Sequence, residues 1–546
     1  MNPHSATATL SRIKISRSRE ASMSKLIVFI AAALAAQEVP VLEKGVGNVH
    51  YAVSTKSANA QKFFDQGMAY LYGFNHEAAI RSFKKASELD PHMAMAYWGI
   101  ALALGPNINL DVDPDREKQA YEAVQMALKH EADASPKERD MIAALAKRYS
   151  NDPQANLKKL SSDYSAAMGT LTKKYPDDLD LATLYAESMM DLRPWKFWTH
   201  DGKPVEGTEE IIRTLESVLK RNPQHLGANH YYIHAVEAST RPGRALPSAD
   251  RLNTLAPASG HLVHMPAHIY QRTGNYSGAA KANESAAAVD RVFIKKNGKG
   301  GIYPLMYYNH NLQFGSASYA MIGRFSEAKR MADEFGATAV AMARDMPMLE
   351  SAAAAPVLVL VRFAKWGDVI RAPEANAGPL STVLSHFARG VAFARLGDVA
   401  GAQREHELFE TARKSLTDDP GIMQNSPKNV AQVADGILDG RIAEARGDRP
   451  AALAAYRRAV EAQDTLDYDE PPDWFYPARE TLGAALLRMG QPAEAEKVFR
   501  VDLDRNPNNP RSLFGLAEAR KAQKKSAASA LAQFRRAWHG DALQVE

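Results

Sequence analysis

Apolar residues recur at helical spacing along almost the whole chain, and short groups of Gly, Pro and Asn divide them into pairs of segments. Residues 57–91 show the pattern well: large and small side chains alternate over two helix-length segments, and Pro91 closes the second. Small residues let two helices approach, large residues fill the space between them, and a proline disfavours helix at the residue before it. No segment of any length alternates with the period of two typical of strands. The pattern therefore predicts an all-α protein built from helix pairs.

The helix pairs repeat along the chain. After the pair at 57–91, further pairs are centred on Gly323, Gly367, Gly397, Gly447 and Gly490, and the final pair ends in polar residues. Repeats of this kind contact only their neighbours, so a chain of 546 residues needs no single large core. We expect about ten to twelve helix pairs, from a repeat length near 34 residues.

Two histidine pairs lie in the middle of the chain. His230 and His234 are four residues apart, as are His264 and His268, and the second pair follows the first by one repeat of 34 residues. Residues four apart share one face of a helix. Glu237 extends the first pair on the same face. Two neighbouring repeats are thus predicted to present the same two side chains at the same place.

Two repeat segments resemble a known family closely. FNHEAAIRSFKKASELDP and GQPAEAEKVFRVDLDRNP are similar to units of the tetratricopeptide superfamily, and the repeat spacing follows that superfamily over nearly all of residues 57–540. The resemblance implies an all-α, tetratricopeptide-type right-handed α-solenoid, a superhelix of antiparallel helix pairs. The chain also looks like a group of exported bacterial tetratricopeptide proteins of unsettled function.

The resemblance places many polar residues on one surface, because the first helix of each repeat lines the concave face in that superfamily. It implies that ionisable side chains from four successive repeats converge there; they are Glu187, Asp191, His230, His234, Glu237, His261, His264, His268 and His310. Other residues are expected to line the groove or to form a lid over it, although Trp98 can instead belong only to the core: Gln271, Gln313, Trp98, Trp195 and Trp198.

The histidine pairs predict a transition-metal site. Packed helices lie about 8–10 Å apart, and a metal takes imidazole nitrogen at roughly 2.0–2.1 Å, so two histidines from each side can meet one ion. The predicted ligands are His230, His234, Glu237, His264, His268, His310, Glu187 and Asp191. Imidazole and carboxylate together suit Zn, Fe, Cu or Mn. If the site is a metal-dependent hydrolytic or oxidative enzyme, Glu237 or Glu187 is the candidate general base.

Three alternatives stay open. The histidines can instead be the polar lining of a groove that binds a peptide or protein, and His261 or His310 taken alone is more often an ordinary polar residue. Pro266, between His264 and His268, either kinks their helix or marks a late start that would leave His261 and His264 in a turn. The loop that holds Trp195 and Trp198 is either a lid or an insertion packed onto the repeats.

Composition removes several function classes. The net charge of +4 is spread along the chain and favours neither nucleic acid nor an anionic membrane. The chain has no cysteine, which excludes disulfides and thiolate metal sites. It also lacks GxSxG, P-loop, HExxH and dinucleotide-binding motifs. The expected partner is therefore a peptide or protein in the groove, with no nucleic acid and no stable membrane span.

The N-terminus has the pattern of an export signal. Basic residues precede an apolar run, Leu26 to Leu34, and Ala33-Leu34-Ala35 fits a cleavage site. The run is too short to span a bilayer; the alternatives are an apolar terminal helix or a start at Met23. We expect an exported protein, periplasmic or secreted. The predicted segments are a leader (1–36), a linker (37–56), and N-terminal (57–176), central (177–340) and C-terminal (341–546) sets of repeats.

Overall fold

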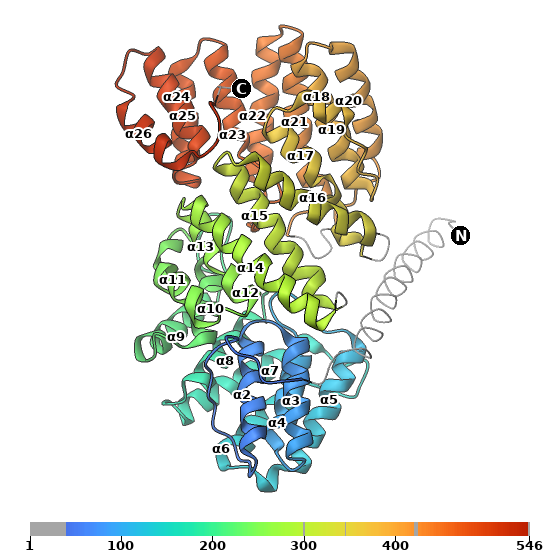
Figure 1. Cartoon of the computed structure of the whole chain (residues 1–546), viewed down its shortest axis with the longest axis vertical. Helices are drawn as coiled ribbons and strands as arrows, with labels where there is room; N and C mark the ends of the chain where they lie inside the picture. Colours follow the sequence, from blue (N-terminus) through green and yellow to red (C-terminus); the bar gives the residue numbers. More distant parts are fainter. Residues whose placement is uncertain (1–39, 299–300, 344–345, 420–423, 544–546) are drawn as a thin grey trace, which may run out of the picture. The chain divides into compact units, whose positions relative to one another are not determined.

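The structure is a computed structural model that describes residues 40–298, 301–343, 346–419 and 424–543. The described residues fall into two compact units that divide between Phe293 and Ile294. Figure 1 shows the helices along the chain. The helices of the first unit are α2 (Ala58–Tyr72), α3 (His76–Leu89), α4 (Ala94–Leu104), α5 (Pro114–Lys129), η1 (Glu131–Asp133), α6 (Pro136–Leu145), α7 (Leu157–Lys174), α8 (Leu179–Met190), α9 (Thr208–Arg221), α10 (Leu226–Val236), η2 (Pro242–Ala245), α11 (Leu246–Leu255), α12 (Gly260–His264), α13 (Pro266–Arg272) and α14 (Tyr276–Asn297), whose last residues lie past the division.

The second unit is built in the same way. Its helices are η3 (Pro304–Tyr308), α15 (Asn309–Met321), α16 (Phe325–Met342), η4 (Pro347–Ala354), α17 (Ala355–Arg362), α18 (Trp366–Arg371), α19 (Pro379–Arg395), α20 (Val399–Arg413), α21 (Pro427–Ala445), α22 (Arg449–Asp464), α23 (Ala478–Arg488), α24 (Pro492–Arg505), α25 (Pro510–Ala522) and α26 (Ala528–Ala537). Consecutive helices such as α19 and α20, or α21 and α22, lie side by side.

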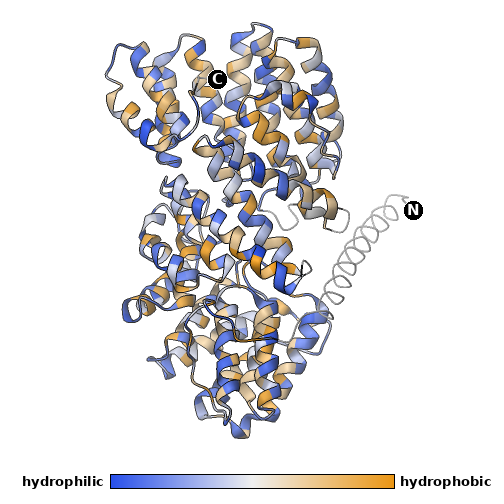
Figure 2. Ribbon diagram, viewed as in Figure 1, coloured by the Kyte–Doolittle hydropathy of each residue, from blue (hydrophilic) through white to orange (hydrophobic). Residues whose placement is uncertain are grey.

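Small residues let the paired helices approach, as the sequence pattern predicts. A Cβ atom at Gly67 of α2 would lie 2.4 Å from the ring of Phe83 on α3, and one at Gly99 of α4 would lie 2.6 Å from the same ring. Both positions therefore require glycine in this packing. Figure 2 shows hydrophilic and hydrophobic residues mixed along most helices, as expected of helices with one buried face.

A tight turn joins the two helices of many pairs, with one residue in the left-handed region. Glycine supplies it at Gly274 (φ 78°), Gly323 (φ 86°), Gly397 (φ 83°), Gly447 (φ 79°) and Gly490 (φ 76°). In each case the next backbone N–H donates to a carbonyl five residues back, as Asn275 does to Tyr270 at 2.7 Å. Glycine is favoured there because it has no Cβ to clash.

The prediction of an all-α fold is confirmed. In the described ranges, extended pairing is limited to two isolated bridges, Asn107 with Leu110 and Trp198 with Pro204. No helix among the described residues is both long and apolar enough to cross a bilayer.

The described part of the predicted linker, 40–56, packs along the first repeats. Tyr51 is 5% exposed and its hydroxyl donates to Asp178 at 3.1 Å. The Ser54 amide donates to the Glu138 carboxylate at 2.6 Å. The predicted leader lies outside the described residues. The division at 293/294 falls inside the predicted central segment, 177–340, so the compact units do not follow the three predicted sets of repeats.

Candidate metal centre

The histidines come from two repeats of the first unit. His230 and His234 lie on α10, while the second group is divided between two short helices on either side of Met265. His261 and His264 belong to α12, and His268 belongs to α13. Proline is tolerated as the first residue of α13 because that position makes no intrahelical N–H bond. The helix is thus interrupted at Pro266, and His261 and His264 remain helical.

All of these side chains are buried. The cluster, which we call the histidine cluster, has no member more than 2% exposed; its members are His230, His234, Glu237, His261, His264 and His268. The prediction that they line an open groove is therefore wrong. Helix α10 packs against α2, and an aromatic turn and loop cover the remaining side, so elements of the same unit fill this part of the face.

Hydrogen bonds fix the protonated nitrogen of two imidazoles on α10. Nδ1 of His230 lies 2.6 Å from the carbonyl oxygen of Tyr72, and Nδ1 of His234 lies 2.8 Å from Oε1 of Glu237. A carbonyl and a carboxylate only accept, so Nδ1 carries the proton in both rings. Each neutral ring then presents a lone pair on Nε2, and an acceptor on the far nitrogen is the usual companion of a metal-bound histidine.

Three of the imidazole rings converge. One ligand nitrogen from each of His230, His234 and His261 lies within 4.8 Å of the others, and Nε2 of His230 is 3.1 Å from Nε2 of His261. Tetrahedral ligands at roughly 2.0–2.1 Å from a metal are about 3.3 Å apart. Nε2 of His234 is buried and has no hydrogen-bond partner within the part of the chain that the structure describes. The three rings therefore have the spacing and the orientation of a metal-ligand set.

Burial sets the charge state of the cluster. It lowers the pKa of His230, His234 and His261, and repulsion between the rings lowers the pKa of His230 and His261 further. These imidazoles are neutral, which is the form that binds metal. Burial alone would raise the pKa of Glu237, but its interactions with His268 and His234 outweigh that effect and hold the pKa well below its usual value. The cluster therefore combines three imidazoles whose neutral form is favoured by burial with one ionised carboxylate.

Phe74, in the turn between α2 and α3, covers the histidine cluster. Its ring centroid is 4.5 Å from that of His230, and it stacks on His234 at 5.9 Å and on His261 at 5.6 Å. Phe74 has φ 54° and occupies the turn position that Gly274 holds in its own repeat. A phenylalanine in the left-handed region costs of order 1–3 kcal/mol of conformational free energy. The packing of its ring on the histidines outweighs this cost.

Sequence reasoning missed Phe74, although a signal was present. In GFN the aromatic residue precedes Asn75, just as glycine precedes Asn275 in TGN. An aromatic residue where other repeats carry glycine marks a turn held by a tertiary contact. The same reasoning missed Asn283 on α14, whose Oδ1 lies 2.6 Å from Nδ1 of His264.

The aromatic loop 191–207 contacts both the histidine cluster and the backbone of α10. The Trp195 ring meets His234 edge-on, with centroids 5.4 Å apart, and its backbone is left-handed at φ 64°. Nε1 of Trp198 donates to the carbonyl of Ala235 at 2.9 Å, which fastens the loop to α10. Trp198 thus packs an insertion, while Trp195 lies over the histidine whose Nε2 is unpartnered.

The carboxylates predicted as ligands on α8 have other partners. Asp191 pairs with Arg148 at 2.6 Å, and both side chains are at most 2% exposed. Burial, followed by repulsion from Asp191, raises the pKa of Glu187 well above its usual value. Glu187 Oε2, Asp191 Oδ1 and the Tyr164 hydroxyl are buried without a hydrogen-bond partner among the described residues. Their placement corrects the ligand prediction for Glu187 and Asp191, because Arg148 supplies the opposing charge.

Four further predicted residues lie on α4, α13 and α15. Trp98 is 1% exposed and belongs to the core around α4, so its prediction as groove lining is wrong; it lies on a helix that is buried on every side. Gln271 is half-buried on α13. His310 and Gln313 lie on α15, in the second unit.

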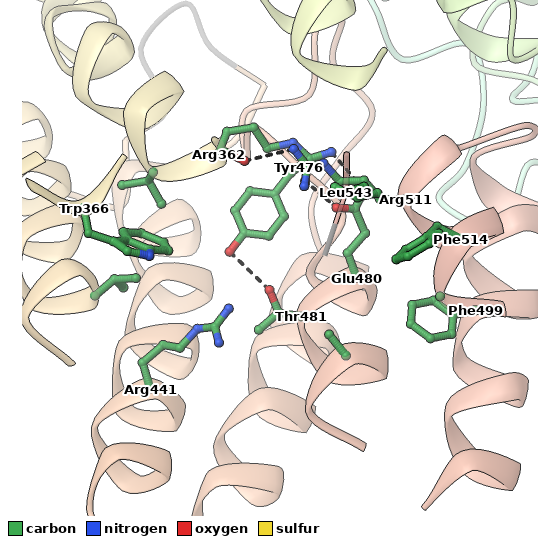
Figure 3. Close-up of a pocket in the computed structure, with 14 residues that line it drawn as sticks. Arg362, Trp366, Arg441, Tyr476, Glu480, Thr481, Phe499, Arg511, Phe514 and Leu543 are labelled. Carbon is green, nitrogen blue, oxygen red and sulfur yellow. Dashed lines mark hydrogen bonds and ion pairs between the residues drawn. The ribbon is translucent and has the colours of Figure 1, made fainter. Parts of the chain in front are cut away.

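The second unit has a pocket of its own, shown in Figure 3. The pocket encloses about 70 Å³, which is enough for a small chemical group and too little for a whole drug-sized ligand. Arg362 forms a two-pronged ion pair with Glu480, with Nη2 to Oε1 at 3.0 Å. Arg441 and Arg511 also line the pocket, beside aromatic walls. Three arginines and one carboxylate, Glu480, therefore line the pocket.

Comparisons with known proteins concern the repeats. Models of the tetratricopeptide repeat match residues 63–93 and 481–542. No curated protein matches the chain. The human IFIT1 dimer with m7Gppp-AAAA is 13% identical, with 88% of this chain and 90% of that chain covered and a TM-score of 0.33. The APC/C hetero-tetramer Cut9–Hcn1 is 13% identical, with 91% of this chain and 81% of that chain covered and a TM-score of 0.32. Yeast Tom70 is 12% identical, with 86% of this chain and 90% of that chain covered and a TM-score of 0.29. The prediction of tetratricopeptide repeats is confirmed, and such distant likenesses say nothing about a ligand.

Proposed function

We propose that this chain of tetratricopeptide-type helix pairs binds a transition metal within its first unit, through Nε2 of His230, His234 and His261. The observation that carries the proposal is the fixed protonation of the rings: Tyr72 and Glu237 hold the Nδ1 protons of His230 and His234. The lone pairs of these two rings are thereby aimed at the point where His261 also arrives. All three donors are imidazole nitrogens, which suit Zn, Cu and Fe better than Ca or Mg.

The test is direct. The chain is prepared metal-free and equilibrated with Zn²⁺, and bound metal is counted. We expect tight uptake that His234→Asn lowers by one equivalent. His386→Asn is the matched control, because His386 is also buried with Nδ1 2.8 Å from a glutamate, Glu405, on α20. Absence of uptake by the folded wild-type chain would overturn the proposal.

A metal-dependent enzyme is the second candidate. Three protein ligands leave a coordination position for water or substrate, and a metal in such a site activates bound water. Glu237 accepts from two imidazoles, so its role is to orient ligands and not to act as a base. Glu187 is the other carboxyl predicted as a base, and it is buried beside Asp191 and Arg148. Turnover of a substrate by the metal-loaded chain, lost in Glu187→Gln with metal uptake intact, is the outcome that separates enzyme from binding protein.

The second proposal concerns a protein partner. We propose that the arginine-lined pocket of the second unit takes an acidic group of a peptide, because its arginines extend from α17, α21 and α25 into one aromatic-walled space. Weaker binding of a labelled acidic peptide by Arg441→Ala is the expected result. Peptide binding that is unaffected by this change would remove the pocket from the proposal.

The protein is proposed to act outside the cytoplasm. The support is the basic, apolar and small-residue pattern of residues 12–35. Mature protein from the source cell should begin near Ala36, as N-terminal sequencing can determine. An intact leader on cytoplasmic protein would contradict export.

A further inference from the structure

We propose that His264 and His268 hold a second metal ion, beside the one assigned to His230, His234 and His261. Nε2 of His264 lies 2.8 Å from Nε2 of His268, and the two ring planes are nearly perpendicular, at 79°. Both side chains are at most 1% exposed. The inference rests on the proposed metal site, because the two histidine groups share Glu237.

The His264 ring carries its proton on Nδ1. That nitrogen lies 2.6 Å from Oδ1 of Asn283. Nδ2 of Asn283 donates to the carbonyl of Ala279 at 2.9 Å, which fixes the orientation of the amide. Oδ1 is therefore the atom that faces the ring, and it can only accept. With its proton on Nδ1, the neutral form of the ring has its lone pair on Nε2.

The His268 ring is oriented in the same way. Its Nδ1 lies 2.5 Å from Oε2 of Glu237. Nε2 of His268 therefore also carries a lone pair, and it points at the lone pair of His264. Two such atoms at 2.8 Å repel each other unless a cation lies against both. The possible cations are a proton shared by the two rings or a metal ion that takes both nitrogens.

A metal is the cation proposed here because both far nitrogens face acceptors, the arrangement usual for metal ligands. A shared proton predicts no second bound ion, so the two cases differ in the number of metal ions that the chain takes up. The metal class is again one that prefers nitrogen, such as Zn²⁺, Co²⁺ or Cu²⁺.

Glu237 connects the two sites. Oε1 accepts from Nδ1 of His234, in the first ligand set, and Oε2 accepts from Nδ1 of His268, in the second. One carboxylate therefore orients one ligand of each ion and adds negative charge between two cations. The ring centroids of His234 and His268 are 5.4 Å apart, so the two ligand sets are neighbours.

The experiment counts metal in the full chain. Metal-free protein is dialysed against Zn²⁺, and bound zinc is measured by mass spectrometry alongside a circular dichroism check of folding. We expect two equivalents for wild type, one for His264→Ala/His268→Ala, one for His230→Ala/His261→Ala, and two for the control His386→Ala. A Co²⁺ absorption titration of unmodified protein should show two phases, which keeps the test independent of any variant's folding.

The experiment distinguishes failure of the second metal site from failure of the proposed function. One equivalent in the folded wild-type chain, with a single Co²⁺ phase, overturns the second ion and leaves the proposed function standing; His264 and His268 then share a proton or serve the same single ion. Two equivalents retained by folded His264→Ala/His268→Ala also overturn it. No zinc at all in the folded wild type removes both proposals.

Discussion

Replacing Glu237 by glutamine tests the ligand geometry most directly. The carboxylate accepts from Nδ1 of His234 at 2.8 Å and from Nδ1 of His268 at 2.5 Å. A glutamine amide has one accepting oxygen and one donating nitrogen. One of the two histidines would then face a donor and would have to accept on Nδ1. Its proton would move to Nε2, where it blocks metal binding, while the size of the side chain at position 237 stays the same.

The expected loss follows from the loss of one oriented ligand and one nearby negative charge. Removing a partner that orients a ligand typically costs 10–100-fold in metal affinity. Each factor of ten corresponds to about 1.4 kcal/mol, so Glu237→Gln should weaken binding by about 1.4–2.8 kcal/mol. The buried amide nitrogen facing a histidine nitrogen places the effect at the upper end.

Competition against a coloured chelator measures this change, because it reports affinity and not only occupancy. The matched control is Glu405→Gln, which alters a glutamate that accepts from Nδ1 of the buried His386 at 2.8 Å in the other unit. The control should bind metal like wild type. If Glu237→Gln binds metal as tightly as wild type while remaining folded, the histidines are not held in the ligand tautomer by this carboxylate, and the reasoning fails.

Three further predictions concern the cover of the cluster and the second unit. Phe74→Gly should relieve left-handed strain of order 1–3 kcal/mol but lose a buried aromatic side chain worth about 3–5 kcal/mol; we expect net destabilisation in urea and faster metal release, and an unchanged release rate would mean that Phe74 does not cover the ion. Metal-induced change in tryptophan fluorescence should vanish in Trp195→Phe and persist in Trp198→Phe, and the reverse result would contradict the position of Trp195 over His234. Burial raises the pKa of Glu444, but hydrogen bonds and charge from Arg488 with further groups outweigh it and lower the pKa to about 2. Because the folded pKa lies below the unfolded value of about 4.3, this stabilisation is present above about pH 4.3 and is lost as the pH falls toward 2. A shift from about 4.3 to about 2 corresponds to about 3 kcal/mol, which solvent screening of the partly exposed Glu444 reduces to about 2 kcal/mol. Glu444→Gln should therefore unfold more easily at pH 7 by about 2 kcal/mol, and its stability should fall less steeply below about pH 4.3. Parallel stability curves for the variant and wild type against pH would refute the assignment.

Local chemistry made much of the fold predictable. Helical periodicity, small residues at helix contacts and glycine before the second helix act within one or two turns of chain, so residues 57–91 could be recognised as a helix pair from their letters. The spacing of His230 and His234 likewise places both on one helix face without reference to the rest of the molecule. The interruption at Pro266 could be anticipated but not resolved, because a proline is compatible with both a kink and a helix start.

The tertiary structure alone decided which of these side chains are buried and which groups they contact. The carbonyl that orients His230 belongs to Tyr72, 158 residues earlier, and only the packing of α10 against α2 brings the two together. The same packing turned an expected open groove into a closed cluster beneath Phe74. Asp191 has the spacing of a ligand, yet Arg148 neutralises it. Periodicity specifies which face of its own helix a residue occupies, whereas the partner that covers that face depends on the path of the whole chain.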